Sequence, residues 1–142
     1  MDLATLTSAT TAIISNTNLI RINQDPKSPQ ATCFAGCSVH ADWFILATTT
    51  SDGTTVVLVI NWTEVALKLK PLEAYSVGVV PGPDEALEVR NLWTNEVVNF
   101  VDIGRTIPVP ILQRHSCIVY ELKTTRAQRQ RVGAEVEIRV VD

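Results

Sequence analysis

The sequence contains two neighbouring carboxylates, Asp84 and Glu85, whose spacing could serve acid–base chemistry. The residues before them, Gly82 and Pro83, are typical of an exposed turn, where water solvates both carboxylates and leaves them unsuited to catalysis. Asp25 precedes a proline and is expected to fold a turn, while Asp2 is expected to cap a helix. The sequence therefore predicts no catalytic carboxylate pair.

Thiol and imidazole groups are the next candidates for chemistry. His115 and Cys117 are two residues apart on a predicted strand, so they can face the same side and form a thiol–imidazole couple, but no third group orients them. The alternative is a histidine at the start of a strand beside a buried thiol, which we favour. His40 and Asp42 share the same spacing, and two ligands do not define a metal site. Neither a metal nor a cofactor is expected.

The three cysteines cannot all pair with one another. Cys33 and Cys37 are close enough in sequence to form a disulfide across a short loop, which requires an oxidising compartment. Cys117 is left over and is expected to be buried. The predicted disulfide therefore joins Cys33 to Cys37.

Aromatic and glycosylation signals give two further candidate sites. Sugar-binding proteins stack sugar rings on exposed indoles, and alternation places Trp43 and Trp93 in the core, which leaves Trp62 as the candidate carbohydrate-binding residue. Asn61, Trp62 and Thr63 form a sequon for N-glycosylation, which has meaning only in the secretory pathway. A position at a strand end would make Asn61 accessible to a glycan.

The composition predicts one globular domain. The chain has 142 residues, of which 46% are hydrophobic and 19% are charged, and this is sufficient for one buried core. Its net charge of -3 argues against a nucleic-acid-binding surface, which needs clustered Lys and Arg. No apolar run approaches the length that spans a bilayer, so a membrane partner is not expected either.

The elements expected from the sequence are one short helix followed by an all-β region. Apolar residues at helical spacing predict the helix within residues 2–16, with Thr7 or Ser8 as its cap and Asn16 as its end. A brief apolar element and an Asx-Pro turn follow, up to Pro26. Alternation and turn signals then predict strands, with a hairpin around Asp52-Gly53. The predicted strands are residues 41–48, 54–62, 65–70, 87–93, 96–101 and 116–122.

The end of the chain differs in character from the predicted strands. Residues 124–131 are polar and basic without interleaved aromatic residues, which indicates a solvated linker rather than a nucleic-acid-binding patch. Residues 136–141 can form one more strand. The predicted fold is an all-β antiparallel sandwich of seven to eight strands, of the Greek-key type, preceded by one short helix.

Two parts of the sequence resemble the α-galactosidases of glycoside hydrolase family 27. The first is Asp2-Leu3, the predicted helix and the run Ile20-Arg21-Ile22-Asn23-Gln24-Asp25-Pro26, which is similar to the family's exit from its catalytic barrel. The second consists of sandwich motifs in the family's order: Asp52-Gly53 with the strand after it, then Val89-Arg90-Asn91-Leu92-Trp93 and His115 to Leu122. Asn91 replaces the family's Asp, and Lys27 and the region after Leu122 depart from its pattern.

This resemblance, which is closest to fungal-type members, implies three regions. Residues 1–26 correspond to the end of a (β/α)8 barrel, residues 27–122 to the C-terminal β-sandwich, and residues 123–142 to an extension of unassigned role. The family is a group of retaining hydrolases of terminal α-D-galactosyl residues, and its Lys-Tyr-Asp motif, which carries the nucleophile, does not occur here. A barrel needs about 250 residues, so this chain cannot contain one.

The resemblance therefore implies a non-catalytic domain that braces its catalytic barrel and does not hydrolyse galactosides alone. The alternative is a free-standing carbohydrate-binding module, with galactosides as its partners. Met1 to Thr5 show no secretory signal, whereas the parent enzyme that the resemblance implies is expected to be secreted. A self-contained hydrolase is not expected.

Overall fold

The computed structural model describes residues 7–101 and 106–126 as two short helices followed by strands in two antiparallel sheets. The strands of the large sheet lie in the order β1-β2-β3-β8-β5-β6, and β4 and β7 form a second, two-stranded sheet. The elements are α1 (Ser8–Ile14), α2 (Thr17–Asn23), β1 (Thr32–Ala35), β2 (Trp43–Thr49), β3 (Thr55–Asn61), β4 (Leu72–Glu73), the 3-10 helix η2 (Ala74–Val77), β5 (Glu85–Asn91), β6 (Val97–Val101), β7 (Thr106–Ile107) and β8 (Cys117–Arg126). The predicted all-β sandwich is confirmed.

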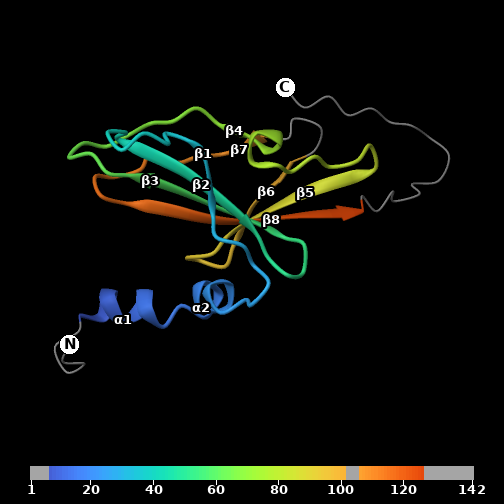
Figure 1. Cartoon of the computed structure of the whole chain (residues 1–142), viewed down its shortest axis with the longest axis horizontal. Helices are drawn as coiled ribbons and strands as arrows, with labels where there is room; N and C mark the ends of the chain where they lie inside the picture. The colour runs from blue at the N-terminus through green and yellow to red at the C-terminus, as the bar shows by residue number, and fades with distance from the viewer. Residues whose placement is uncertain (1–6, 102–105, 127–142) are drawn as a thin grey trace.

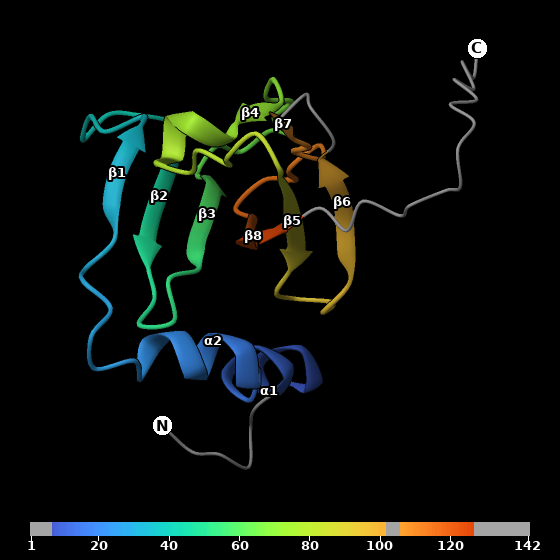
Figure 2. The ribbon, with the colours of Figure 1, turned by 90° about the vertical axis from the view of Figure 1, so that its right-hand side faces the viewer.

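The large sheet is covered on its two faces by different elements. Figure 1 shows β4, β7 and η2 on one side of it and α1 and α2 on the other, and Figure 2 shows the same arrangement after a quarter turn. The inner face, toward β4 and β7, carries the main core, in which Val57, Val59, Leu87 and Val89 have no exposed surface. Tyr120 joins the two layers, because its hydroxyl donates to the carbonyl of Pro108 at 2.9 Å. The core thus lies between the two sheets.

The N-terminal region contains two helices where the sequence predicted one. Thr7 caps α1 as expected, since its hydroxyl accepts a hydrogen bond from the backbone N–H of Thr10 at 3.1 Å. Asn16 was predicted to end the helical region, but its side chain caps α2 by accepting from the N–H groups of Asn18 and Leu19. The prediction of a brief apolar element from residue 19 was therefore wrong, because an asparagine cap begins a second helix there.

The hairpin of β2 and β3 was predicted to within two residues. Its register runs from Trp43 opposite Asn61 to Thr49 opposite Thr55, with a turn between them that contains Gly53 at a φ of 82°. Predicted strands 87–93, 96–101 and 116–122 correspond to β5, β6 and β8. β8 is longer than expected and continues to Arg126 against β5, so residues 123–126, predicted as an extension, form part of the sheet.

The predicted strand 65–70 is not formed, and three short strands were not predicted. Leu67 makes only an isolated bridge with Leu112, and the carbonyl of Val65 accepts from the side chain of Asn61 instead of a neighbouring strand. β1, β4 and β7 have two to four residues each, too few for alternation to be recognised. The predicted strand at residues 136–141 lies outside the described residues.

Candidate functional site

Glu85 and Asp25 have structural roles in turns. Glu85 accepts a hydrogen bond from the backbone N–H of Gly82 at 2.8 Å, so its carboxylate closes the turn before β5. Asp25 accepts from the N–H groups of Ser51 at 2.6 Å and Lys27 at 3.0 Å, and these backbone hydrogen bonds lower its pKa. Asp25 thus folds its turn and fastens it to the β2–β3 hairpin. Asp2 lies outside the described residues.

The hairpin turn holds a second carboxylate whose pKa is strongly lowered. Asp52 accepts from the hydroxyls of Thr50 at 2.5 Å and Thr54 at 2.8 Å, and these bonds are the main reason why its pKa falls from 3.8 to about 2. Arg21 on α2 lies 3.9 Å from Asp52 and also pairs with Glu121 on β8. Asp52 therefore stays ionised in weak acid and helps to attach α2 to the sheet.

The histidines and the free cysteine do not form a reactive couple. His115 pairs with Glu64, with 2.8 Å between Nε2 and Oε1, whereas Cys117 lines the surface under α2, where burial raises the pKa of its thiol. His40 and Asp42 lie on the surface. In the ranges that the structure describes, no three His, Cys, Asp or Glu residues are placed to hold a metal ion.

The prediction that alternation made holds for Trp43 and Trp62, but Trp93 was wrongly placed in the core, because it packs on the outer face of the sheet. Trp43 packs against the main core and Trp93 against the outer face of the sheet, whereas Trp62 is 56% exposed just after β3. Trp62 does not line either of the two depressions described below. An exposed indole is thus present, outside these two depressions.

The predicted glycosylation site at Asn61 is contradicted by its burial. Asn61 has no exposed surface, and its Nδ2 donates to the carbonyls of Val65, Leu112 and Gln113 at 2.9 to 3.1 Å. Its Oδ1 accepts from the backbone N–H and the hydroxyl of Thr63. The sequon of Asn61 and Thr63 is therefore an internal hydrogen-bonded turn, and the folded chain has no room for a glycan on Nδ2.

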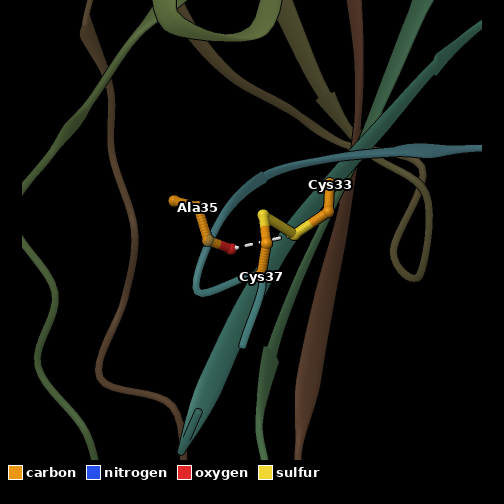
Figure 3. Close-up of a disulfide and its surroundings, with 3 residues drawn as sticks. All are labelled: Cys33, Ala35 and Cys37. Carbon is orange, nitrogen blue, oxygen red and sulfur yellow. Dashed lines mark hydrogen bonds between the residues drawn. A yellow bond between two sulfur atoms is a disulfide. The ribbon is translucent and has the colours of Figure 1, made fainter. Parts of the chain in front are cut away.

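The cysteines predicted to pair are joined in the structure. The sulfurs of Cys33 and Cys37 are 2.11 Å apart, and the bridge closes a short loop that leaves the end of β1 (Figure 3). The loop includes Ala35 and Gly36, whose φ is 68°. A Cβ on Gly36 would lie 1.9 Å from the carbonyl oxygen of Trp43, so the tight approach of the loop to β2 requires glycine at this position.

An apolar groove lies on the outer face of the large sheet, under α2. It has a volume of about 370 Å³ and is lined mainly by apolar side chains. Ile13, Ile14 and Ile20, on the two helices beside it, have exposed fractions of 54%, 53% and 37%. We call this groove and the three isoleucines the outer apolar face. Lining residues from both sides of the groove include Leu19, Ile22, Leu46, Leu58 and Trp93.

Comparison with known protein families identifies the family of this domain. Residues 40–122 match the model of the alpha galactosidase C-terminal beta sandwich domain. The chain belongs to this family. The resemblance carried by Asp52-Gly53, the run from Val89 to Trp93 and the strand ending at Leu122 is thereby confirmed.

Solved structures share the fold of this α-galactosidase C-terminal domain. α-Galactosidase I from Mortierella vinacea matches with a TM-score of 0.69 and 22% identity, over 86% of this chain and 30% of its own. A GH27 β-L-arabinopyranosidase from Geobacillus stearothermophilus matches with a TM-score of 0.67 and 17% identity, over 84% of this chain. An α-galactosidase from Saccharomyces cerevisiae, solved with raffinose, matches with a TM-score of 0.59 and 15% identity, over 87% of this chain and 39% of its own.

The chain spans about a quarter of the length of the arabinopyranosidase. No curated protein sequence matches it. Among the described residues, no helix is both long and apolar enough to cross a bilayer.

Sequence reasoning did not find the outer apolar face of this family member. Its residues come from α1, α2, β2, β3, β8 and the loop after β5, and the pairing of the strands brings those of the groove together. One signal in the sequence was that both faces of a strand carry apolar residues: in β3, Val56 and Leu58 alternate with Val57 and Val59. A strand that is apolar on both faces indicates cover on both sides.

Proposed function

We propose that this chain is the non-catalytic C-terminal β-sandwich of an α-galactosidase-type glycosidase of family 27, and that it braces a (β/α)8 catalytic barrel. The observation that carries the proposal is the outer apolar face. A groove of about 370 Å³ that is lined mainly by apolar side chains lies beside three partly exposed isoleucines, and contiguous exposed apolar surface marks an interaction site. A catalytic barrel joined to the N-terminal side of α1 would cover this face.

The chain is proposed to have no hydrolytic activity of its own. Retaining glycosidases need two carboxylates facing one sugar ring, and the carboxylates described above close turns or fasten α2 to the sheet. Asp52, with a pKa of about 2, cannot act as a general acid near neutral pH. The barrel is therefore proposed to supply the chemistry.

An activity assay tests the non-catalytic role. The purified chain is incubated with p-nitrophenyl α-D-galactopyranoside and p-nitrophenyl β-L-arabinopyranoside, and nitrophenol release is expected to equal that of buffer alone. Turnover that copurifies with the folded chain and is lost on unfolding would contradict the proposal. Reading the gene upstream of Met1 for a frame with a Lys-Tyr-Asp segment tests for the barrel itself.

Substitutions on the outer apolar face test the bracing role. The double substitution Ile14→Asp and Ile20→Asp is expected to remove most of the fluorescence of anilinonaphthalene sulfonate bound to the isolated chain, because charges disrupt the apolar surface that binds the dye. Val80→Asp is the matched control, since Val80 is 72% exposed and follows η2 on the other side of the sheet. Equal dye binding by all three proteins would overturn the assignment of this face.

The same substitutions can be made in a protein that carries this domain joined to its barrel. There the isoleucine pair is expected to lower the temperature at which galactosidase activity is lost, and Val80→Asp is expected to leave it unchanged. An unchanged inactivation temperature for both would contradict bracing through this face.

The exposure of Trp62 favours carbohydrate binding as a second candidate function. An indole that is 56% exposed can stack against a galactoside ring. Titration of tryptophan fluorescence with methyl α-D-galactopyranoside tests this function. A saturable change that disappears in Trp62→Phe would support it, and no change would contradict it.

We also propose that the parent protein is secreted. The disulfide between Cys33 and Cys37 supports this, because such bonds persist in oxidising compartments. Mass spectrometry of the protein from its natural source would detect the oxidised pair, whereas two free thiols at these positions would argue against secretion.

A further inference from the structure

A second, smaller depression lies on the inner face of the sheet, where β1, β2 and β3 approach η2. Its volume is about 130 Å³, well below the roughly 300 to 1,000 Å³ of pockets for drug-sized ligands. None of its lining residues is charged. It shares only Thr48 with the groove of the outer apolar face, so the proposed contact with a barrel does not account for it.

An aromatic side chain on a covalently closed loop forms one side of this depression. Phe34 lines it with 45% of its surface exposed, and the register of β1 against β2 shifts around this residue. The loop that begins at Phe34 is closed by the disulfide of Cys33 and Cys37 and held against β2 at Gly36 (Figure 3). Phe34 is thus an exposed apolar group whose backbone is restrained.

Hydroxyl groups from three adjacent strands form another side. Thr32, Thr49 and Thr55 lie on β1, β2 and β3, and Thr49 is directly opposite Thr55. In the part of the chain that the structure describes, these three side-chain hydroxyls have no hydrogen-bond partner. Free hydroxyls that both donate and accept therefore line the depression.

The part of the rim formed by Pro29 and Gln30 is also held in place. Thr48 donates a hydrogen bond to the carbonyl of Pro29 at 2.6 Å, which fixes the segment that carries Gln30 along the edge of β2. The amide of Gln30 has no partner among the described residues and adds a donor and an acceptor to the rim. The depression is accordingly formed before any ligand binds.

We propose that this depression binds one ring of a neutral saccharide. The apolar C–H face of a sugar ring packs against Phe34, and its hydroxyls exchange hydrogen bonds with Thr32, Thr49 and Thr55. The absence of any charged lining residue disfavours phosphates and acidic sugars, since nothing would compensate their charge. The small volume restricts the contact to a single ring and predicts an affinity of about 1 mM, because few atoms are buried.

Nuclear magnetic resonance of the isotopically labelled chain tests the proposal. Backbone amide signals are followed while D-galactose, methyl α-D-galactopyranoside or raffinose is added. Saturable shifts are expected at Phe34, Thr49 and Thr55 for at least one of these sugars. Phe34→Ala is expected to weaken binding by roughly tenfold, and Phe34→Tyr, which keeps the ring, is expected to retain it.

Matched controls separate the depression from other surfaces. Thr49→Val removes a hydroxyl at constant shape and is expected to weaken binding several-fold. Thr124→Val is expected to have no effect, because Thr124 is an exposed residue of β8 that does not line the depression. Trp62→Ala is also expected to have no effect. The amide spectrum of each variant reports whether it is folded, and Phe34→Tyr and Thr49→Val keep the test valid if Phe34→Ala unfolds.

Two results would overturn the proposal. One is the absence of saturable shifts with all three sugars at concentrations tenfold above the expected dissociation constant. The other is a set of shifts centred on Trp62 with Phe34 and Thr49 unchanged, which would assign sugar binding to the exposed indole instead. Neither result bears on bracing of a barrel, because that function rests on the opposite face of the sheet.

Discussion

Asn61 joins the end of β3 to two loops. Its amide supplies the donors for carbonyls of two loops, at Val65 and at Leu112 and Gln113, while its backbone ends β3. The sequon of Asn61 predicts that its side chain lies on the surface. The structure shows that the side chain is buried, because its amide donates hydrogen bonds to carbonyls of two loops. Local sequence could not reveal this, since the carbonyls concerned are up to 52 residues away.

We predict that Asn61→Ala lowers the free energy of unfolding by about 3 kcal/mol, because its buried amide loses its hydrogen bonds to three carbonyls, although each carbonyl keeps a second donor. Thr63→Val is the control: it removes the hydroxyl that donates to Asn61 and also bonds Val65, and should cost about 1 kcal/mol. Urea denaturation followed by tryptophan fluorescence measures both. If Asn61→Ala matched the control, the three hydrogen bonds would not contribute as described.

A second prediction at the residue scale concerns the two glycines with positive φ in loops beside β2. Gly36→Ala is expected to destabilise the domain by about 3 kcal/mol or more, since the new Cβ meets a carbonyl oxygen in addition to the strained backbone. Gly53→Ala has the same strain at a φ of 82° but open space around it, and should cost about 1 kcal/mol. Similar urea midpoints for the two variants would show that the β1 loop can move away from β2.

Among the elements, α2 is attached to the sheet by both apolar and charged contacts. Leu19 and Ile22 pack against Val56, Leu92 and Val119 on the outer face, and Arg21 pairs with Glu121 and lies near Asp52. The helical periodicity predicted a helix before the sandwich. It could not predict the cap at Asn16, because an asparagine after one helix can equally end it or begin another.

The lowered pKa of Asp52 makes the hairpin turn sensitive to acid. A carboxylate whose pKa is lower in the folded state stabilises the fold above its unfolded value, and this contribution is lost as the pH falls. We therefore expect the stability difference between the native chain and Asp52→Asn to shrink as the pH falls from 3.8 toward about 2. The side chain is largely exposed, so the full difference is expected to be about 1 kcal/mol or less.

Urea denaturation at a series of pH values measures this effect. Asp42→Asn is the control, since Asp42 is exposed and its carboxylate makes no hydrogen bond in the described part of the chain. A difference between the native chain and Asp52→Asn that did not change with pH would show that the threonine hydroxyls do not hold the ionised carboxylate.

For the whole molecule, the contacts of α2 argue against a domain boundary at residue 26, which the resemblance predicted. Asn16 donates to the carbonyl of Leu92 at 3.0 Å, and Leu19 and Ile22 of α2 pack against the outer face of the sheet. We predict that deleting residues 1–15 changes the free energy of unfolding by less than about 1 kcal/mol, and that deleting residues 1–26 lowers it by about 2 to 4 kcal/mol.

Thermal and urea unfolding of the two truncated chains measure this difference. Equal stability of both would place α2 with the barrel, as the sequence predicted. If deletion of residues 1–15 alone lowered the free energy of unfolding as much as deletion of residues 1–26, α1 would support the sandwich through contacts made by its exposed isoleucines.

The overall architecture could be predicted from the sequence, and the surfaces could not. The hairpin around Gly53 and the long strands were evident because runs rich in Val, Ile and Thr persist over seven or more residues beside turn signals. The depression beside Phe34 and the outer apolar face depend on which strands are neighbours. Chain order does not give this, since β8 lies between β3 and β5.

The central position of β8 also determines when the domain can fold during synthesis. β3 and β5 do not pair with each other. β8 lies between them: its residues 117–122 pair with β3 and its residues 120–126 pair with β5. Until β8 leaves the ribosome, the sheet consists of two separate halves, each with an unpaired edge that can bind to other chains. A premature stop codon before residue 117 would therefore remove the whole sandwich and not only its last strand, and the unfinished chain would be a substrate for chaperones and proteases.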